Sequence, residues 1–496
     1  MTDSMMMKPV RVALIWPGGI FSSEGNFGIP QILSLANAVQ RTGCAEVTVY
    51  DLDAERALGT RLDQAIRHGN YDLVAISCYS SYDYLKVMGL ASWLRPCAEA
   101  AWFVVGGYHP SARPDDFLVE GSAFDYVVVG DGETRLTQLV LERHAARTPS
   151  DRILLGSGTD PHATIPYPFA LLERYRPIFD QVAGRIEIYL SRGCPFGCSF
   201  CMERSKRVVT WRALSVDEAM DQIDRLERFI DLRGRTLRIA DALFGMNRDY
   251  RRELLTRLAR RPVQADKIWL LTRADLLERE DFELMAQANV APGMGLESGD
   301  ADILRSTGKL RGSVERFYEH LFEIADWATT YGVPFGTNVI VGLPGESAAS
   351  LERTAQYLDR LFLGPRPTMG FFGVDRFRLY PGSGVAENLD DWHQRTGFVP
   401  HRPRWWFDGD QDFLSEWSDP SAELDFEHAM DHNFRLFAPR LALLLERFAY
   451  HGPARERFLA TIQENLQSWT PTARQRQREL AQLWTPIKGI ETGYQG

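Results

Sequence analysis

Short apolar segments alternate with amphipathic helical patterns along the first 384 residues of this 496-residue chain. The segments are rich in Val, Ile and aromatic residues and have the length of buried β-strands, whereas the apolar residues between them recur at helical spacing. Such alternation predicts parallel sheets with helical crossovers, which is the α/β class. Because a chain of this length exceeds what one hydrophobic core supports, we expect two or three domains.

Residues 1–140 are expected to form a doubly wound parallel sheet of the Rossmann type. Helical patterns such as Pro30–Gln40 and Tyr84–Arg95 separate its strands. The five strand candidates are Arg11–Trp16, Val47–Asp51, Leu73–Cys78, Trp102–Val105 and Tyr126–Val129. Ligands of such sheets bind outside the carboxyl ends of the strands, so the residues that follow the strands are the site candidates.

The carboxyl ends of these strands combine aromatic, polar and glycine residues. The four most informative ends are Trp16–Gly19, Cys78–Tyr82, Gly106–Pro110 and Gly130–Glu133. Glycine lets the backbone approach a ligand closely, although a tight turn between strand and helix also needs glycine. Glycines at two ends of one rim favour a bulky ligand over a purely structural role.

Residues 185–384 carry six further strand candidates, again with amphipathic helices between them, for example Val216–Phe229, Arg248–Arg260 and Ser350–Leu361. The candidates are Ile186–Ser191, Leu237–Asp241, Ile268–Thr272, Ala291–Leu296, Phe335–Val341 and Gly370–Leu379. They predict a partial (β/α)6 barrel, in which chemistry belongs at the carboxyl ends of the strands.

Two segments surround this expected barrel. Residues 141–184 are expected to be a connector, which contains the extended, proline-rich stretch Pro161–Pro168. Residues 385–496 are expected to form a small, mostly helical C-terminal domain, in which the aromatic run 405–407 either walls a substrate cavity or belongs to the core. The helical patterns of this domain are Ala422–Ala438, Leu441–Tyr450, Ala454–Asn465 and Thr472–Trp484.

Polar residues also end the barrel strands. Asp241 and Tyr380 follow the second and sixth strands and are the catalytic candidates; Asp241 either faces the substrate or caps the following helix. Arg273 ends the third strand, and Glu297 and Ser298 end the fourth. A mutual ion pair between Arg273 and Glu297 is the structural alternative to a binding role.

Three clustered cysteines, Cys194, Cys198 and Cys201, lie in the sequence Ser-Arg-Gly-Cys-Pro-Phe-Gly-Cys-Ser-Phe-Cys. A cubane iron–sulfur cluster is normally held by four thiolates, so three closely spaced thiolates leave one iron open to a small molecule. Zinc is the main rival, since three thiolates with water or histidine also bind it. No second cysteine pair and no His-x3–5-His pattern follows, which favours the cluster over zinc.

The spacing C-x3-C-x2-C, with Phe200 before the last cysteine, resembles the signature of radical S-adenosylmethionine enzymes. The resemblance implies a 4Fe–4S cluster ligated by the three cysteines, and S-adenosylmethionine bound at its open iron and cleaved to a 5′-deoxyadenosyl radical. Phe200 is then expected to pack on adenine. Glu297 and Ser298 suit the α-ammonium or the ribose hydroxyls, and Arg273 suits the α-carboxylate.

A second resemblance concerns the first sheet. Val105-Gly-Gly-Tyr-His-Pro110 and Val129-Gly-Asp-Gly-Glu133 are similar to strand ends of cobalamin-binding domains attached to radical S-adenosylmethionine enzymes, although such domains often have proline in place of Tyr108 and Gly-Glu-Gly-Glu in the second segment. The resemblance implies bound cobalamin, with its lower face against the Cys78–Tyr82 loop. The expected cobalamin contacts are Tyr79, Ser80, Tyr82, Gly106, Gly107, Tyr108, His109, Gly130, Gly132 and Glu133.

No Asp-x-His-x-x-Gly motif is present, so the axial histidine of other cobalamin proteins has no counterpart. Three interpretations of His109 stay open: a cobalt ligand, a polar contact to the nucleotide tail, or a structural turn residue.

The two resemblances together imply methyl transfer from methylcobalamin to an unactivated carbon of a small-molecule or peptide substrate, with an electron donor such as flavodoxin or ferredoxin. One alternative keeps the radical chemistry without methyl transfer, as in deoxygenation, cyclisation or rearrangement, with cobalamin auxiliary or absent. A non-enzymatic alternative is an electron carrier or redox sensor that uses the cluster alone.

Composition narrows the partners. With 56 basic and 66 acidic residues the net charge is −10, which argues against nucleic acid as a partner. No stretch reaches the roughly 20 apolar residues that a membrane span needs, and the N-terminal apolar run is predicted to be a strand instead of a signal peptide. Six cysteines, three of them clustered, favour a cytoplasmic location over a disulfide framework.

Overall fold

The computed structural model describes residues 8–18, 30–156, 167–179, 184–206, 209–310 and 312–488. The predicted strand end at Gly19 and most of Pro161–Pro168 lie outside these residues. Apart from the final residue, one compact unit comprises residues 1–189 and 203–231, and the other comprises residues 190–202 and 232–495. Among the described residues, no helix combines the length and apolarity that crossing a bilayer requires.

The first unit contains a parallel sheet of six strands in the order β2-β1-β3-β4-β5-β6. The strands are β1 Val10–Trp16, β2 Ala45–Asp51, β3 Leu73–Ser77, β4 Trp102–Gly106, β5 Tyr126–Val129 and β6 Ile153–Leu155. The five predicted strands are confirmed. The sixth, β6, falls where the sequence predicted only a connector, because a three-residue edge strand is too short to show a periodic pattern.

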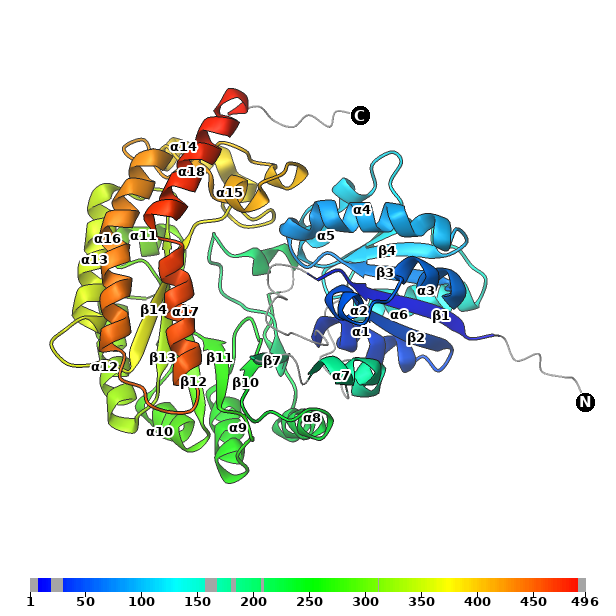
Figure 1. Cartoon of the computed structure of the whole chain (residues 1–496), viewed down its shortest axis with the longest axis horizontal. Helices are drawn as coiled ribbons and strands as arrows, with labels where there is room; N and C mark the ends of the chain where they lie inside the picture. The colour runs from blue at the N-terminus through cyan, green and yellow to red at the C-terminus, as the bar shows by residue number, and fades with distance from the viewer. Residues whose placement is uncertain are drawn as a thin grey trace, which may run out of the picture. The chain divides into compact units, whose positions relative to one another are not determined.

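Helices flank this sheet, as Figure 1 shows. Helix α1 packs against α6, and α3 packs against α4. Helix α8 begins with a capping box in which Ser215 and Glu218 satisfy each other's backbone N–H groups. The helices of the first unit are α1 Pro30–Gln40, α2 Leu52–Ala57, α3 Leu62–Gly69, α4 Tyr84–Leu94, α5 Tyr108–Ala112, α6 Glu133–His144, α7 Arg176–Phe179 and α8 Val216–Phe229.

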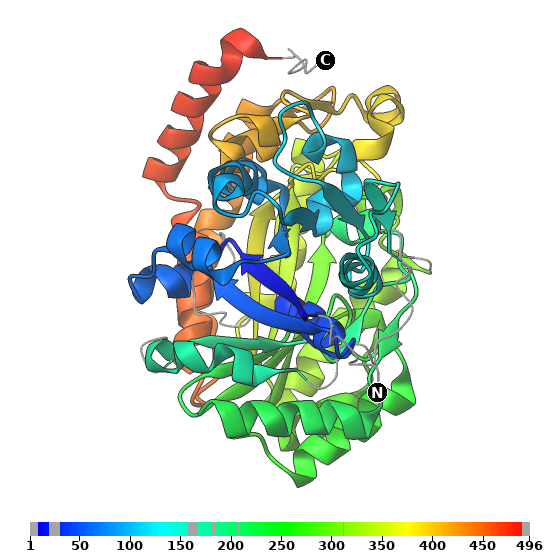
Figure 2. The ribbon, with the colours of Figure 1, turned by 90° about the vertical axis from the view of Figure 1, so that its right-hand side faces the viewer.

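The second unit contains parallel strands β10 to β14, which lie side by side in chain order (Figures 1 and 2). Their bounds are β10 Thr236–Ile239, β11 Lys267–Thr272, β12 Val290–Glu297, β13 Phe335–Val341 and β14 Gly370–Arg376. The remaining predicted strand is β7, Arg185–Ile188, at the end of the first unit. All six predicted strands are therefore present, and strand order follows chain order as in a β/α barrel.

Helices connect the strands of the second unit. They are α9 Arg248–Arg260, α10 Arg279–Gln287, α11 Ala301–Ser306, α12 Val314–Tyr331 and α13 Ala348–Phe362. Of the predicted helices, α9 is confirmed at both ends, and α13 is longer than predicted at both ends.

The C-terminal segment is mostly helical, as predicted. Its elements are α14 Leu389–Thr396, β15 Val399–Pro400, α15 Gln411–Glu416, β16 Ser418–Asp419, α16 Phe426–Arg447, α17 Arg455–Gln467 and α18 Pro471–Trp484. The sequence predicted two helices where α16 runs on through Pro439. Proline disfavours this, but α16 packs along α13 and α17 and buries Phe437, Leu441 and Leu444 on both sides of Pro439.

Helix α17 protects the open edge of the second sheet. The Asn465 amide accepts a hydrogen bond from the Val374 N–H (3.0 Å) and donates one to the Val374 carbonyl (3.2 Å), so a side chain satisfies an edge strand. Of the aromatic run, Trp405 and Trp406 are fully buried, and Trp405 Nε1 donates to the Leu379 carbonyl (2.7 Å). Both tryptophans are therefore core residues and do not wall a cavity.

Candidate functional site

The three clustered cysteines lie on an irregular loop of the second unit that follows Ser191–Arg192. None of the three cysteines is in a disulfide and all three are partly exposed, and a turn with a hydrogen bond from the Cys201 N–H to the Cys198 carbonyl (3.2 Å) joins the last two. Among the described residues, no group of three His, Cys, Asp or Glu side chains is arranged so that it could hold a metal ion. As a donor set, three accessible thiols on one irregular loop fit a 4Fe–4S cluster.

Segments from beyond the strand ends hold this cysteine loop (residues 193–201). The Ser199 N–H donates to the Thr307 carbonyl (2.8 Å), and the Ser199 carbonyl accepts from the Val385 N–H (2.9 Å). A Cβ atom added at Gly384 would lie 3.0 Å from Ser199 Cα, so only glycine permits this approach comfortably. The loop is therefore anchored at its middle by two segments far apart in sequence.

Asp241 anchors the chain where it enters the cysteine loop. Its Oδ1 accepts from the N–H groups of Leu190 (2.8 Å) and Ser191 (3.0 Å), and its Oδ2 accepts from Ser191 Oγ (2.6 Å). Burial raises the pKa of Asp241 to about 7. Asp241 does not cap the following helix, since Asn247 caps α9. The buried carboxyl group therefore anchors the entry to the cysteine loop, and the expected role of Asp241 toward the substrate stays a prediction.

Arg273 and Glu297 do not form the mutual pair that was the structural alternative. Arg273 pairs with Asp275 (Nη2 to Oδ2, 2.8 Å), and its guanidinium lies 3.7 Å from the ring centroid of Phe196 in the cysteine loop. Glu297 Oε1 pairs with Lys309 Nζ at 2.8 Å, with both side chains buried. Lys309 was missed because a lone lysine in a loop after a helix carries no strand-end signal.

Ser298 and Tyr380 differ in their surroundings. Ser298 is fully buried; its Oγ hydrogen-bonds Thr354 Oγ1 (3.1 Å) and accepts from the Asp300 N–H (3.1 Å). The hydroxyl of Ser298 already has two partners within the protein, and its expected role toward S-adenosylmethionine stays a prediction. Tyr380 is partly exposed; burial raises its pKa, and Arg378 acts in the opposite direction. Its catalytic role stays a prediction.

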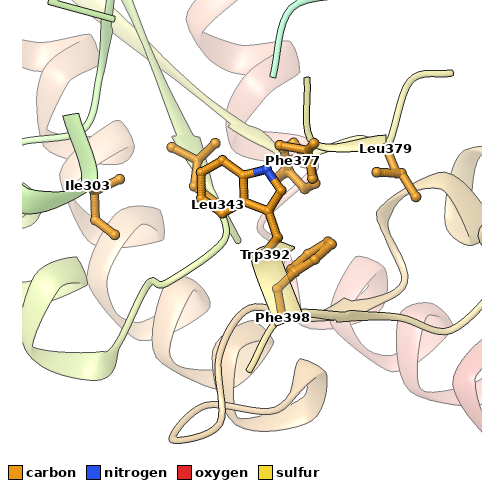
Figure 3. Packing of buried hydrophobic residues seen from close by; sticks show 7 residues of the cluster. Ile303, Leu343, Phe377, Leu379, Trp392 and Phe398 are labelled. Carbon is orange, nitrogen blue, oxygen red and sulfur yellow. The ribbon is translucent and has the colours of Figure 1, made fainter. Parts of the chain in front are cut away.

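Phe200 packs against an apolar cluster that is shown in Figure 3. The cluster consists of Ile303, Leu343, Phe377, Leu379, Val385, Trp392 and Phe398. The Phe200 ring is only partly buried, so one part rests on this cluster and another stays accessible. This partly accessible position agrees with the expected contact with adenine, which stays a prediction.

The rim of the first sheet carries a row of aromatic rings. Tyr79 lies between Trp16 (centroids 5.7 Å apart) and Tyr108 (5.2 Å). The Tyr108 hydroxyl donates to Glu203, and Lys206 Nζ lies 4.2 Å from the centroid of the Tyr108 ring. Both partners follow the cysteine loop in sequence and belong to the first unit. The rim is therefore aromatic and partly apolar, which suits the lower face of a corrin.

The glycines of this rim have structural reasons. Gly107 has φ +129°, and a Cβ atom there would lie 2.1 Å from the Cys78 carbonyl oxygen. At Gly130, φ +84°, it would lie 3.2 Å from the Lys206 carbonyl oxygen, and at Gly132 3.0 Å from Leu35. By contrast, a Cβ atom added at Gly106 would make only ordinary van der Waals contacts with Val128. Packing within the protein thus explains glycine at Gly107 and Gly130, and neither indicates a ligand.

Four residues predicted to contact cobalamin are buried inside the first unit. His109 is buried, with Nδ1 2.6 Å from Ser81 Oγ and Nε2 3.2 Å from Asp116 Oδ2. Buried Glu133 accepts from Ser34. Ser80 and Tyr82 are also buried, with Ser80 Oγ capping the turn at 81–83. Of the three interpretations of His109, these contacts favour the structural turn residue, and its contact with cobalamin stays a prediction.

His109→Gln is expected to lower the free energy of unfolding by about 1–3 kcal/mol, because buried hydrogen-bonding groups of Ser81 or Asp116 lose their partner. It should leave the coordination of bound cobalt unchanged, since both ring nitrogens are already engaged. Chemical denaturation and the electron paramagnetic resonance of Co(II) measure the two effects. Loss of nitrogen hyperfine splitting in the variant alone would contradict the structural role.

Comparisons with known proteins agree with these two sites. The B12 binding domain family matches residues 24–140, and the Radical SAM superfamily matches residues 188–358. The chain is 25% identical over 303 residues to 2-(S-pantetheinyl)-carbapenam-3-carboxylate methyltransferase of Streptantibioticus cattleyicolor, which covers 56% of this chain and 43% of that relative. The chain therefore spans less than half the length of that relative.

Two solved structures with cobalamin bound have a similar fold. The radical S-adenosylmethionine methyltransferase TsrM from Kitasatospora setae, with cobalamin and a 4Fe–4S cluster bound, matches with a TM-score of 0.62 and 16% identity over 79% of this chain and 77% of that chain. The cobalamin-dependent radical enzyme OxsB, with aqua-cobalamin bound, matches with a TM-score of 0.68 and 14% identity over 96% of this chain and 72% of that chain. The chain therefore combines a B12 binding domain with a domain of the Radical SAM superfamily, and it is similar to cobalamin-dependent radical S-adenosylmethionine enzymes.

Proposed function

We propose that the protein transfers a methyl group from S-adenosylmethionine to an unactivated carbon of a small-molecule or peptide substrate. The observation that supports this most is the presence in one chain of a B12-binding sheet with an aromatic rim and a loop with three accessible thiols. When bound, the cluster supplies the electron that cleaves S-adenosylmethionine, and cobalamin carries the methyl group.

The residues of the chain divide this work. Cys194, Cys198 and Cys201 would hold the cluster, and Asp241 holds the chain that enters their loop. Glu297 presents a buried carboxylate that suits the α-ammonium or ribose of S-adenosylmethionine, and the partly exposed Phe200 suits its adenine.

Arg273 keeps its expected role toward the α-carboxylate as a proposal. Its guanidinium already donates hydrogen bonds to Asp275 and to the Lys309 carbonyl (2.9 Å). Binding of the α-carboxylate therefore requires guanidinium N–H groups that these two partners do not use.

The aromatic rim of the first sheet has a separate task. Tyr79 and Tyr108 would lie against the corrin and keep water and nitrogen ligands from cobalt. The absence of an Asp-x-His-x-x-Gly motif and the committed ring of His109 agree with this arrangement. We further propose that the protein works in a reducing cytoplasm with a flavodoxin or ferredoxin as electron donor, in line with six cysteines that form no disulfide.

Anaerobically reconstituted protein, given cobalamin, S-adenosylmethionine and a reductant, tests this proposal against candidate substrates. We expect a methylated product together with equal amounts of S-adenosylhomocysteine and 5′-deoxyadenosine, and no product without cobalamin. Mass spectrometry with methyl-labelled S-adenosylmethionine identifies the transferred group. Formation of 5′-deoxyadenosine with an unmethylated but altered product would overturn methyl transfer.

That last outcome is the second candidate function, a radical rearrangement, cyclisation or deoxygenation. One observation favours it: OxsB, which covers 96% of this chain, is described as a radical enzyme, whereas TsrM is described as a methyltransferase. An electron carrier is the remaining alternative, and it predicts no cleavage of S-adenosylmethionine at all.

A further inference from the structure

We propose that Lys309 is a positioning residue that fixes the Glu297 carboxylate and the cysteine loop in one arrangement for S-adenosylmethionine. This inference rests on the use of S-adenosylmethionine in the function proposed above. It concerns a residue outside the strand ends, and it follows from four contacts in the second unit.

The first contact is the ion pair itself. Lys309 Nζ lies 2.8 Å from Glu297 Oε1, with the two side chains only 7% and 9% exposed. A buried ion pair contributes little net stability, because taking two charges out of water costs about as much as their attraction returns. The pair is therefore better explained by the placement of a charge than by stability.

The backbone around Glu297 supports a placed carboxylate. Glu297 has φ +66°, a left-handed conformation that is strained for a non-glycine residue. The register of β12 against β13 also shifts between Gly295 and Glu297. A Cβ atom at Gly295 would lie 1.9 Å from Glu297 Oε1 and 2.7 Å from Lys309 Nζ, so glycine leaves room for the pair. The irregular end of β12, Gly295 and Lys309 together fix the position of the Glu297 carboxylate.

The segment 307–309 also contacts the cysteine loop. The Thr307 carbonyl accepts from the Ser199 N–H (2.8 Å), and a Cβ atom at Gly308 would lie 3.5 Å from the Gly197 carbonyl oxygen. The Lys309 carbonyl accepts from Arg273 Nη2 (2.9 Å). One short segment thus binds the loop that carries the thiols, the end of β11 and the end of β12.

Removal of the Lys309 ammonium leaves a buried carboxylate without its counter-charge and loosens the segment that supports the loop. Partners that orient a ligand-binding group typically change affinity about 10–100-fold when they are removed. We therefore expect Lys309→Met to raise the Kd for S-adenosylmethionine about 10- to 100-fold. Arg305→Met is the matched control, because Arg305 precedes the same segment but pairs with Asp302 and Glu315 at the surface.

The test uses cluster-loaded, full-length protein under anaerobic conditions. Equilibrium dialysis gives the Kd for S-adenosylmethionine, and the electron paramagnetic resonance of the reduced cluster reports its binding. Glu297→Gln and the double variant Glu297→Gln with Lys309→Met complete a cycle. Because Lys309 acts through Glu297, we expect Lys309→Met to change the Kd less than about twofold when Glu297→Gln is already present.

A double variant that binds about tenfold more weakly than Glu297→Gln would overturn the inference, and so would an unchanged Kd in Lys309→Met. The double variant has no unpaired charge, so its comparison with Glu297→Gln still tests the inference where Lys309→Met does not fold. Absence of methylated product with the expected pattern of Kd values would reject methyl transfer alone. Native protein that binds no S-adenosylmethionine would reject both proposals.

Discussion

Cys198→Ala is expected to abolish the cleavage of S-adenosylmethionine, with 5′-deoxyadenosine formation falling by at least about 100-fold. The remaining two thiolates cannot hold a cubane that already depends on three, and both lie on a loop with no further cysteine. Iron and sulfide content should fall in parallel. Metal analysis, visible absorption and chromatographic assay of 5′-deoxyadenosine after dithionite reduction measure these effects.

The matched control is Cys97→Ala. Cys97 is also free and partly exposed, but it lies in the first unit, far in sequence from the cysteine loop. The Cys97→Ala variant should keep full iron content and activity, since the Cys97 thiol accepts only a weak hydrogen bond from Arg67 Nη2 (3.6 Å) whose loss affects neither the cluster nor its loop. If Cys198→Ala retained a complete cluster, or if native protein contained zinc in place of iron, the radical mechanism would be refuted.

The strands could be predicted because their signal is local. Buried parallel strands such as β1 and β13 are continuous apolar runs, and their bounds agree with the sequence prediction to within one residue. Helix α16 and strand β6 show the limit. Packing on α13 and α17 carries α16 through Pro439, and β6 exists only as a short partner for β5. Both depend on contacts between distant segments, which no local pattern encodes.

The candidate site shows the same distinction between local sequence patterns and contacts between distant segments. The cysteine motif and the strand-end position of Glu297 are visible in the sequence, whereas the partner of each polar group is not. Lys309 lies 12 positions from Glu297 and reaches it only because α11 folds the chain back. Ser298 and His109 have the residue types of ligand contacts, but Thr354 and Asp116 occupy their hydrogen-bonding groups. Residue type predicts what a side chain can bind, and tertiary structure decides whether it is free to do so.

Asp241 is the second position where a single change should have a large effect. Asp241→Ala removes the acceptor of three buried hydrogen bonds and leaves the N–H groups of Leu190 and Ser191 without it. At about 1 kcal/mol or more for each bond, we expect the free energy of unfolding to fall by about 3 kcal/mol. The entry to the cysteine loop should loosen as well, so that the variant holds less iron. Denaturant unfolding and metal analysis measure both.

Asp241→Asn separates the hydrogen bonds from the charge. The pKa of Asp241 is raised from 3.8 to about 7, chiefly by burial, so folding favours the protonated form. Its contribution to stability is therefore fully present below pH 3.8 and is lost as pH rises towards 7. Glu346, whose pKa burial raises to about 8, gives a change of the same sign in both proteins. The difference in the free energy of unfolding between Asp241→Asn and native protein therefore contains the contribution of Asp241 without that of Glu346.

We expect the free energy of unfolding of Asp241→Asn to rise relative to that of the native protein by about 1.4 kcal/mol for each pH unit between about pH 4 and 7. The difference should stay constant above about pH 7, where the native carboxylate is ionised in both the folded and the unfolded state. Denaturant unfolding of the two proteins across this range supplies the measurement. A constant difference from about pH 4 to 8 would mean that Asp241 is already ionised in the folded protein at the acid end, and that burial is not what sets its charge.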